Sequence, residues 1–155
     1  MKTWSRSTLL LIGLVGAGCS ASAPEPKTLN YGLTLAPTGI DPHLNASAEL
    51  GIPLTAVYDT LVVQDPATGE ILPSLAERWE VSPDGRTYTF DLRDDVRFHD
   101  GTTFDAEDVV ANLDYVVDPD NHSQKAVFML GPFERAEALD ARTVAIHLSE
   151  PFPPL

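Results

Sequence analysis

The sequence has little cysteine and no long hydrophobic run. Cys19 is the only cysteine among 155 residues, so the chain cannot form an internal disulfide. An apolar run near the N-terminus covers only residues 9–18, whereas a helix needs about 20 apolar residues to cross a bilayer. We therefore expect neither a disulfide framework nor a membrane-spanning helix in this run.

Basic side chains are also scarce. The chain has 10 Lys and Arg against 23 Asp and Glu, a formal net charge of -13. Such a surface repels phosphate backbones, which argues against nucleic acid as a partner. The acidity favours solubility; attraction of cationic solutes is an alternative that net charge alone does not decide. A hydrophobic content of 43% with 21% charged residues is typical of a folded domain.

Motifs for catalysis and cofactor binding are missing. The sequence contains no Gly-rich phosphate loop and no Gly-x-Ser-x-Gly elbow. His99 and Asp100 lie near Asp94 and Asp95, which fits either a metal site or acid–base pair, or a surface turn. The sequence His-Asp-Gly-Thr favours the turn. The other histidines lack metal-ligand spacing: His43, His122 and His147. We predict no catalytic residue, no metal and no cofactor.

The first residues have the pattern of an export signal. Lys2 and Arg6 precede the apolar run, and the small residues Gly16, Ala17 and Gly18 follow within it. A short apolar core behind basic residues and before small residues is typical of a secretory signal. The sequence predicts a signal peptide over residues 1–18.

Small residues followed directly by Cys19 resemble the lipobox of bacterial lipoproteins. The resemblance implies that the Cys19 thiol receives a diacylglycerol and that Cys19 becomes the new N-terminus, with several acyl chains giving a stable membrane anchor. Gly16 stands where that family prefers Leu, and an ordinary signal with an incidental Cys19 is the alternative. Residues 20–27 (SASAPEPK) read as a flexible tether, so we assign residues 19–27 to a lipidated tether.

The remaining residues, 28–155, carry the patterns of a folded part. The first strand is predicted over residues 28–33, and the prolines and glycine of residues 34–46 predict a loop. A helix capped by Ser47 is predicted next, with Pro53 either kinking it or moving its start. Its apolar residues have helical spacing: Leu50, Leu54, Val57 and Tyr58. Residues 61–63 predict a strand.

Three turn sequences follow, at residues 65–70, 82–85 and 99–102. Apolar residues alternate with polar ones on both sides of the second turn, which predicts a hairpin with one buried face. These apolar residues are Trp79, Val81, Tyr88, Phe90 and Leu92. We expect the three aromatic residues to pack in a core, and Gly85 and Gly101 to adopt positive φ in their turns.

A second helix and a second hairpin are predicted further along the chain. Asp105 is a candidate N-cap, with acidic residues in the first turn behind it. The helix carries an apolar stripe: Val109, Val110, Leu113, Val116 and Val117. Residues 118–121 (DPDN) end it. Residues 133–139 and 143–148 predict the second hairpin, and the absence of a closing element after it predicts a truncated domain.

The motifs between residues 61 and 117 closely resemble family 5 of the bacterial extracellular solute-binding proteins, the peptide- and nickel-binding components of ABC importers. The matching positions are residues 40–42, 58–63, 68–71, 73, 75–76, 79, 81–82, 84–85, 87–90, 92–93, 96, 98–101, 104, 106, 108–109, 140, 143–144, 148 and 151. The resemblance implies an α/β fold of the type II periplasmic-binding-protein class. The chain would supply an incomplete form of it, the N-terminal part of the first lobe with an extra subdomain of β-hairpins and helices.

The resemblance also implies a function. The protein would be an extracytoplasmic solute-binding component of an ABC importer, periplasmic or on the cell surface and lipid-anchored, that captures peptides or related solutes and delivers them to permease subunits. No bond would be broken, so it would not be an enzyme. Backbone groups of the loop after the first strand would bind an extended ligand: Thr34, Leu35, Ala36 and Pro37. An extracytoplasmic enzyme and a signalling lipoprotein on the same scaffold are the alternatives.

Overall fold

The computed structural model describes residues 28, 30, 32, 39–44 and 51–152 of the chain. The chain divides into two units, residues 1–32 and 33–155. In the first unit only Thr28, Asn30 and Gly32 are described; they are exposed and belong to no helix or strand. The first predicted strand is therefore not seen at these three positions, and its other residues lie outside the described part.

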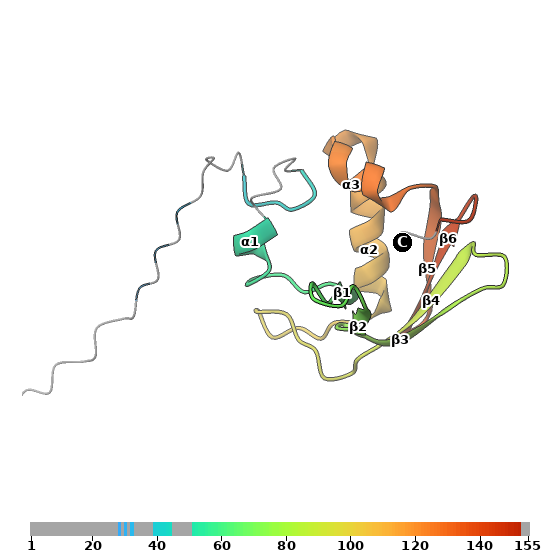
Figure 1. The fold of residues 1–155 in the computed structure, drawn as a ribbon, viewed down its shortest axis with the longest axis horizontal. Coiled ribbons are helices and arrows are strands. Elements are labelled where there is room, and N and C mark those ends of the chain that lie inside the picture. Colours follow the sequence, from blue (N-terminus) through green and yellow to red (C-terminus); the bar gives the residue numbers. More distant parts are fainter. Residues whose placement is uncertain (1–27, 29, 31, 33–38, 45–50, 153–155) are drawn as a thin grey trace, which may run out of the picture. The chain divides into compact units, whose positions relative to one another are not determined.

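The second unit contains two antiparallel sheets and short helices (Figure 1). The elements are α1 (Gly51–Leu54), β1 (Val62–Gln64), β2 (Ile71–Pro73), β3 (Ala76–Val81), β4 (Thr87–Leu92), α2 (Ala106–Val117), the 3-10 turn η2 (Pro119–Asn121), α3 (Gln124–Leu130), β5 (Phe133–Asp140) and β6 (Thr143–Leu148). Strands β1 and β2 form a two-stranded sheet, and the larger sheet has the order β3-β4-β6-β5. The mixed composition confirms the predicted α/β class.

Local turn chemistry produces the predicted hairpins. Asp65 accepts hydrogen bonds from the N–H groups of Ala67 and Thr68 between β1 and β2, and the Ser82 hydroxyl accepts from Thr87 N–H at 2.9 Å between β3 and β4. Gly85 has φ 68° and Gly101 has φ 91°, a region that residues with a Cβ rarely adopt. The predicted positive φ values are therefore confirmed.

Burial confirms only part of the predicted hairpin face. Tyr88, Phe90 and Leu92 of β4 are buried, whereas Trp79 is half-buried and Val81 is exposed. Strand β3 lies at the edge of the sheet and its register shifts between residues 76 and 78. An edge strand has one neighbour instead of two, so the prediction that Val81 is buried was wrong.

Helix α2 forms as predicted. The Asp105 carboxylate accepts from the N–H groups of Glu107 and Asp108, and the Asp108 carboxylate accepts from Asp105 N–H, which completes a capping box. Val109, Leu113 and Val116 are buried on one stripe of the helix. Val109 and Leu113 belong to one hydrophobic core together with side chains of β4 and β6, and full burial of such a side chain contributes about 1.5–3 kcal/mol.

The two predicted hairpins join through β4 and β6, which pair Phe90 with Val144 and Tyr88 with Ile146. This pairing makes one four-stranded sheet, and Val144 at its centre is 0% exposed. The sequence patterns predicted each hairpin but not the pairing, because it joins residues that are far apart in the chain.

Two helices differ from the prediction. Helix α1 covers only residues 51–54, and Val57 and Tyr58 beyond it are exposed, so the predicted longer helix was wrong over its C-terminal part. The chain turns after Leu54, whose carbonyl accepts from the N–H groups of both Val57 and Tyr58. The predicted cap, Ser47, lies outside the described residues. Helix α3 was not predicted at all.

Candidate functional site

The predicted site residues Thr34, Leu35, Ala36 and Pro37, and the predicted lipid attachment site Cys19, lie outside the described residues. The described chain resumes at residue 39. The segment of residues 39–44 contacts helix α2 through a group of polar side chains. This contact begins at Asp41, four positions after the last residue of the predicted ligand loop.

Asp41 is the centre of this contact. Its carboxylate accepts from the backbone N–H of His43 at 2.8 Å and lies 3.1 Å from His43 Nδ1. The Tyr115 hydroxyl of α2 donates to the second carboxylate oxygen at 3.2 Å. Burial opposes ionisation of Asp41, but the hydrogen bonds from His43 and Tyr115 outweigh it, so the pKa of this carboxyl is below its ordinary value.

His43 connects Asp41 to α2. Because an ionised carboxylate only accepts, Nδ1 carries the proton that is donated to Asp41, and Nε2 accepts from Asn112 Nδ2 at 3.2 Å. The imidazole also meets the Tyr115 ring edge-on, with centroids 5.5 Å apart and planes at 76°. The His43 carbonyl accepts from the hydroxyl of Ser123, a residue that is 4% exposed, at 2.9 Å.

We refer to these side chains together as the docking cluster: Asp41, His43, Asn112, Tyr115 and Ser123. Residues 112 and 115 are one helical turn apart and share a face of α2. The neighbouring face of α2 is buried: it carries Val109, Leu113 and Val116. The segment of residues 39–44 is therefore fastened to a helix that the hydrophobic core itself holds in place.

The sequence analysis missed this cluster, since it treated His43 as an isolated histidine. The available signal was weak: an Asp-Pro-His sequence, and a polar residue and a tyrosine three positions apart on the polar side of a predicted helix. Neither feature indicates which distant segment it contacts.

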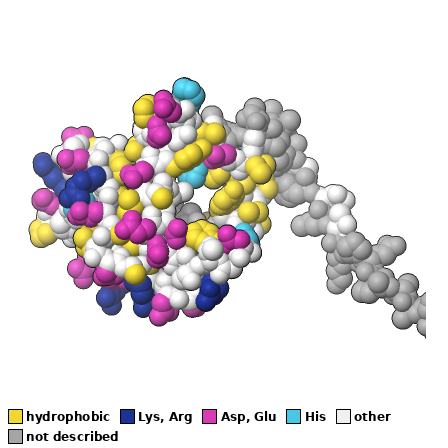
Figure 2. All heavy atoms as spheres, turned by 180° about the vertical axis from the view of Figure 1, so that it is seen from behind, with side chains coloured by type: hydrophobic (Ala, Val, Ile, Leu, Met, Phe, Trp, Pro, Cys, Tyr) yellow, Lys and Arg dark blue, Asp and Glu magenta, His cyan; other side chains and the backbone are white. Residues whose placement is uncertain are grey.

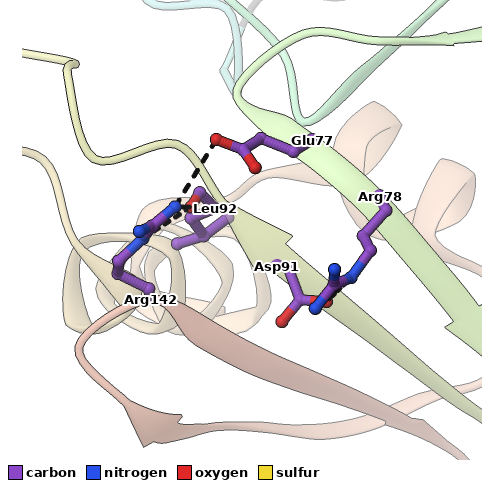
Figure 3. Close-up of a pocket in the computed structure, with 5 residues that line it drawn as sticks. All are labelled: Glu77, Arg78, Asp91, Leu92 and Arg142. Atoms are coloured by element: carbon purple, nitrogen blue, oxygen red, sulfur yellow. Dashed lines mark hydrogen bonds and ion pairs between the residues drawn. The ribbon is translucent and has the colours of Figure 1, made fainter.

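A second polar group lies at the ends of β4 and β6 (Figure 3). Arg142 donates from Nε and Nη2 to the Leu92 carbonyl at 3.0 and 2.8 Å, and from Nη1 to Asp94 at 3.1 Å. Beside it, Arg78 Nε donates to Asp91 at 2.6 Å. These groups line an open hollow of about 370 Å³ together with Glu77. Each arginine faces a carboxylate, so the arrangement joins strand ends and leaves little charge for a ligand.

An apolar groove of about 750 Å³ lies beside α3. Phe128 is 84% exposed and Met129 is 64% exposed on its wall. Phe152 packs on Gly131, where a Cβ would lie 2.6 Å from the phenyl ring. The Tyr88 hydroxyl donates to the Phe152 carbonyl at 3.0 Å and fixes the chain after β6.

The surface carries acidic side chains interspersed with hydrophobic ones (Figure 2). Asp100 accepts from the N–H and the hydroxyl of Thr102 inside the His-Asp-Gly-Thr turn, and these hydrogen bonds from Thr102 lower the pKa of Asp100.

Among the described residues, no three His, Cys, Asp or Glu side chains gather as metal ligands. No helix in that part of the chain is long and apolar enough to cross a membrane.

Of the four histidines, His43 belongs to the docking cluster, and the other three lie elsewhere in the fold. His99 is exposed in its turn, and His122 ends η2 with φ 55°. His147 lies on β6 with Nε2 2.9 Å from Glu137 of β5. Each therefore has a separate structural environment.

A family model and individual relatives both match this chain to bacterial solute-binding proteins. A family model described as bacterial extracellular solute-binding proteins, family 5 Middle, matches residues 70–155. The dipeptide-binding protein of Escherichia coli K12 is 39% identical over 120 residues, which cover 70% of this chain and 22% of that protein. The di/tripeptide-binding protein 2 of Pseudomonas aeruginosa UCBPP-PA14 is 31% identical over 166 residues, covering 96% of this chain and 31% of that protein.

Solved structures agree with the sequence comparison. NikA from Brucella suis, crystallised with Fe(III)-EDTA, superposes with a TM-score of 0.66 and 38% identity over 74% of this chain and 22% of NikA. This similarity confirms the predicted type II periplasmic-binding-protein fold. The chain spans about a quarter of the length of the relatives it matches.

Proposed function

Because the chain belongs to family 5 of the bacterial extracellular solute-binding proteins, we propose that it takes part in capturing peptides or related solutes outside the cytoplasm for an ABC importer. The observation that carries this proposal is the match to the family model over residues 70–155, which include the four-stranded sheet and α2. Two relatives are named for binding dipeptides and di/tripeptides, which supports peptide as the solute.

The ligand would bind by backbone hydrogen bonds. Thr34, Leu35, Ala36 and Pro37 would form the contact with an extended peptide, in which main-chain groups give affinity without selecting side chains. Pro37 has no N–H and would only accept a hydrogen bond. The docking cluster supports this assignment, because it anchors the chain a few residues after this loop.

Solute capture without bond cleavage is the favoured activity, since the family consists of binding proteins. Titration calorimetry of the complete gene product with a dipeptide and tripeptide panel tests the proposal. We expect saturable heat, and mass spectrometry should recover the bound peptide intact. Cleaved peptide would support the alternative of an enzyme on this scaffold. Absence of heat and of thermal shift with every solute would support a signalling lipoprotein.

A metal chelate is the second candidate solute, since the structural relative NikA was crystallised with Fe(III)-EDTA. The same titration with a nickel–histidine complex, with free histidine as the control, distinguishes the two solute classes. Saturable heat with the complex and none with peptides would replace peptide as the solute while leaving the binding role intact.

Residues 28–155 would supply the N-terminal portion of a larger solute-binding domain. Two observations support this assignment: the relatives are about four times as long as the matched region, and Phe128 and Met129 expose most of their apolar surface. A monomeric domain rarely leaves a large apolar patch uncovered. Limited proteolysis checks it: the complete gene product should protect α3, and rapid cleavage there would contradict the assignment.

The membrane anchor is a further part of the proposal. Residues 1–18 would be the signal peptide, residues 19–27 the tether, and Cys19 the lipid attachment site. Two or more acyl chains hold a protein on a membrane stably. The variant Cys19→Ser should move the mature protein from the membrane fraction to the soluble fraction, with Ser20→Ala as the matched control. Unchanged fractionation of Cys19→Ser would contradict lipidation.

A further inference from the structure

Strand β3 has one side of its backbone open. It lies at the end of the four-stranded sheet, and within the described part of the chain only β4 pairs with it. Antiparallel pairing directs the backbone groups of successive residues alternately towards the neighbouring strand and away from it. Ser82 N–H donates to the Thr87 carbonyl at 2.9 Å. The backbone groups of Glu80, two residues earlier, therefore face β4, and those of Trp79 and Val81 face outwards.

This open edge is regular and partly apolar. The register of β3 shifts only at its start, between residues 76 and 78, whereas β5, the other edge strand, has shifts near both of its ends. Bulges hinder the addition of another strand, so β3 is the more receptive edge. Val81 is 46% exposed, and Trp79 is half-buried against the core. A strand added beside β3 would also cover apolar surface.

Two opposite charges lie on the outer face of this edge. Arg78 and Glu80 alternate with Trp79, so their side chains lie on the face of the sheet that is turned away from the core. Arg78 Nε donates to Asp91 of β4 (Figure 3), and its terminal nitrogens make no hydrogen bond to a described residue. Glu80 is exposed and forms no ion pair within the same part of the chain. Both side chains can therefore receive a partner of opposite charge.

A second copy of the same edge complements this pattern. When two β3 strands pair antiparallel through the outward groups of Trp79, Arg78 of each copy lies opposite Glu80 of the other copy. These opposed residues form a non-hydrogen-bonded pair, in which side chains approach most closely. The alternative register, which pairs Trp79 with Val81, places the two copies of Glu80 opposite each other, and like charges at such a position repel. The charges therefore select a single antiparallel register.

We infer that β3 is a self-association edge, through which two copies of the complete gene product form a symmetric dimer. The dimer joins the two four-stranded sheets into one, with an Arg78–Glu80 pair on each side of the two-fold axis and the two Trp79 side chains beside it. The net charge of -13 opposes self-association, and so short an edge buries little surface. The dimer therefore forms at high protein concentration.

Sedimentation velocity of the complete gene product over a series of concentrations measures this dimer. The wild type should shift from monomer to dimer as the concentration rises. Glu80→Arg and Arg78→Glu each place like charges opposite each other at both pairs, so each variant should stay monomeric where most of the wild type is dimeric. Glu134→Arg, the same charge change at an exposed position of β5, is the control and should dimerise as the wild type does.

A mixture of the two charge variants tests the register. In a heterodimer of Glu80→Arg with Arg78→Glu, both pairs again join opposite charges. The equimolar mixture should therefore form dimers that neither variant forms alone. Arg78→Glu also loses its hydrogen bond to Asp91, and circular dichroism shows whether this variant folds. Where it does not, variants of Val81 decide the interface.

The Val81 variants probe the backbone and leave the charges unchanged. Val81→Pro removes an N–H that faces away from β4, so the β3–β4 pairing can persist while the edge loses a donor. Val81→Thr keeps this N–H and is the matched control. Val81→Pro should dimerise more weakly than Val81→Thr and the wild type. In the wild type, amide exchange of Trp79 and Val81 should slow as the concentration rises, whereas exchange of Glu80, which faces β4, should not.

These outcomes do not depend on the proposed function, because the measurements are made without solute. A wild type that stays monomeric throughout the concentration series would overturn the inference. Dimerisation that survives Glu80→Arg, or that is lost equally in Glu134→Arg, would show that β3 is not the interface. A mixture that stays monomeric although both charge variants fold would overturn the register, and equal dimerisation of Val81→Pro and Val81→Thr would overturn strand pairing.

Discussion

The two faces of α2 are stabilised in different ways. The face with Val109, Leu113 and Val116 is buried, and Val109 and Leu113 belong to the same hydrophobic core as side chains of β4 and β6. The adjoining face presents Asn112 and Tyr115 and binds the segment of residues 39–44 through hydrogen bonds at exposed or half-buried positions. Burial of apolar surface contributes more free energy than exposed hydrogen bonds. We therefore expect the buried face to determine whether α2 stays packed in the domain. The polar face should determine where the segment of residues 39–44 lies.

Shortening a side chain on the buried face of α2 should lower the free energy of unfolding more than any other change proposed here. Leu113→Ala removes apolar volume from the core next to the sheet and should lower the free energy of unfolding by about 2–5 kcal/mol. Urea denaturation followed by circular dichroism measures this change. Asn112→Ala, its neighbour on the other face, is the matched control and should cost less than about 1 kcal/mol. Equal losses of unfolding free energy in Leu113→Ala and Asn112→Ala would contradict the claim that the buried face contributes more stability than the polar face.

Removing the N-cap should have an intermediate effect, because it weakens the helix that carries both faces. Asp105→Ala leaves the N–H groups of Glu107 and Asp108 without their acceptor and should cost about 1 kcal/mol. Asp105→Ser keeps a capping oxygen and should restore most of the lost stability. If Asp105→Ser were as unstable as Asp105→Ala, the capping hydrogen bonds would not be the source of the stability that Asp105 contributes.

A change on the polar face should have a smaller effect on stability. Tyr115→Phe removes the hydroxyl that donates to Asp41 but keeps the ring that meets His43 edge-on. We expect a loss of about 0.5–1 kcal/mol or less in the free energy of unfolding. Hydrogen exchange of residues 39–44 should rise in the variant, whereas exchange in α2 should not. A rise throughout α2 would mean that the hydroxyl supports the helix as well as the docked segment.

The stability that Asp41 contributes on the polar face should depend on pH, and this change should be the smallest of the four. The pKa of Asp41 is lowered in the fold, since the hydrogen bonds from His43 and Tyr115 outweigh the opposing effect of burial. The ionised carboxylate therefore contributes stability above its ordinary pKa of about 3.9, and this contribution is lost as the pH falls through the lowered folded value. The stability difference between wild type and Asp41→Asn should shrink from pH 6 towards pH 3. A difference that stays constant over this range would contradict the assignment.

The sequence predicted the elements whose determinants are local. Asp105 and the acidic first turn predicted the start of α2, and Gly85 and Gly101 predicted turns with positive φ, because capping and turn geometry depend on neighbours a few residues away. The buried face of β4 followed from strict alternation. The resemblance to the family was carried by the same local motifs and was confirmed over residues 70–155.

The sequence did not predict features that depend on distant contacts. Val81 has the same alternation as Tyr88 and is exposed, because β3 lies at the edge of the sheet. The β4–β6 pairing and the docking cluster join segments that are remote in the chain, so no local pattern encodes them. The predicted ligand residues 34–37 and Cys19 lie outside the described part and stay predictions.

Hydrogen exchange of the complete gene product, with and without a saturating dipeptide, tests the central claim most directly. The account predicts that residues 34–37 become protected when the dipeptide binds, and that the buried strands β4 and β6 exchange slowly in both states. Saturable binding of the dipeptide without added protection at residues 34–37 would contradict the account.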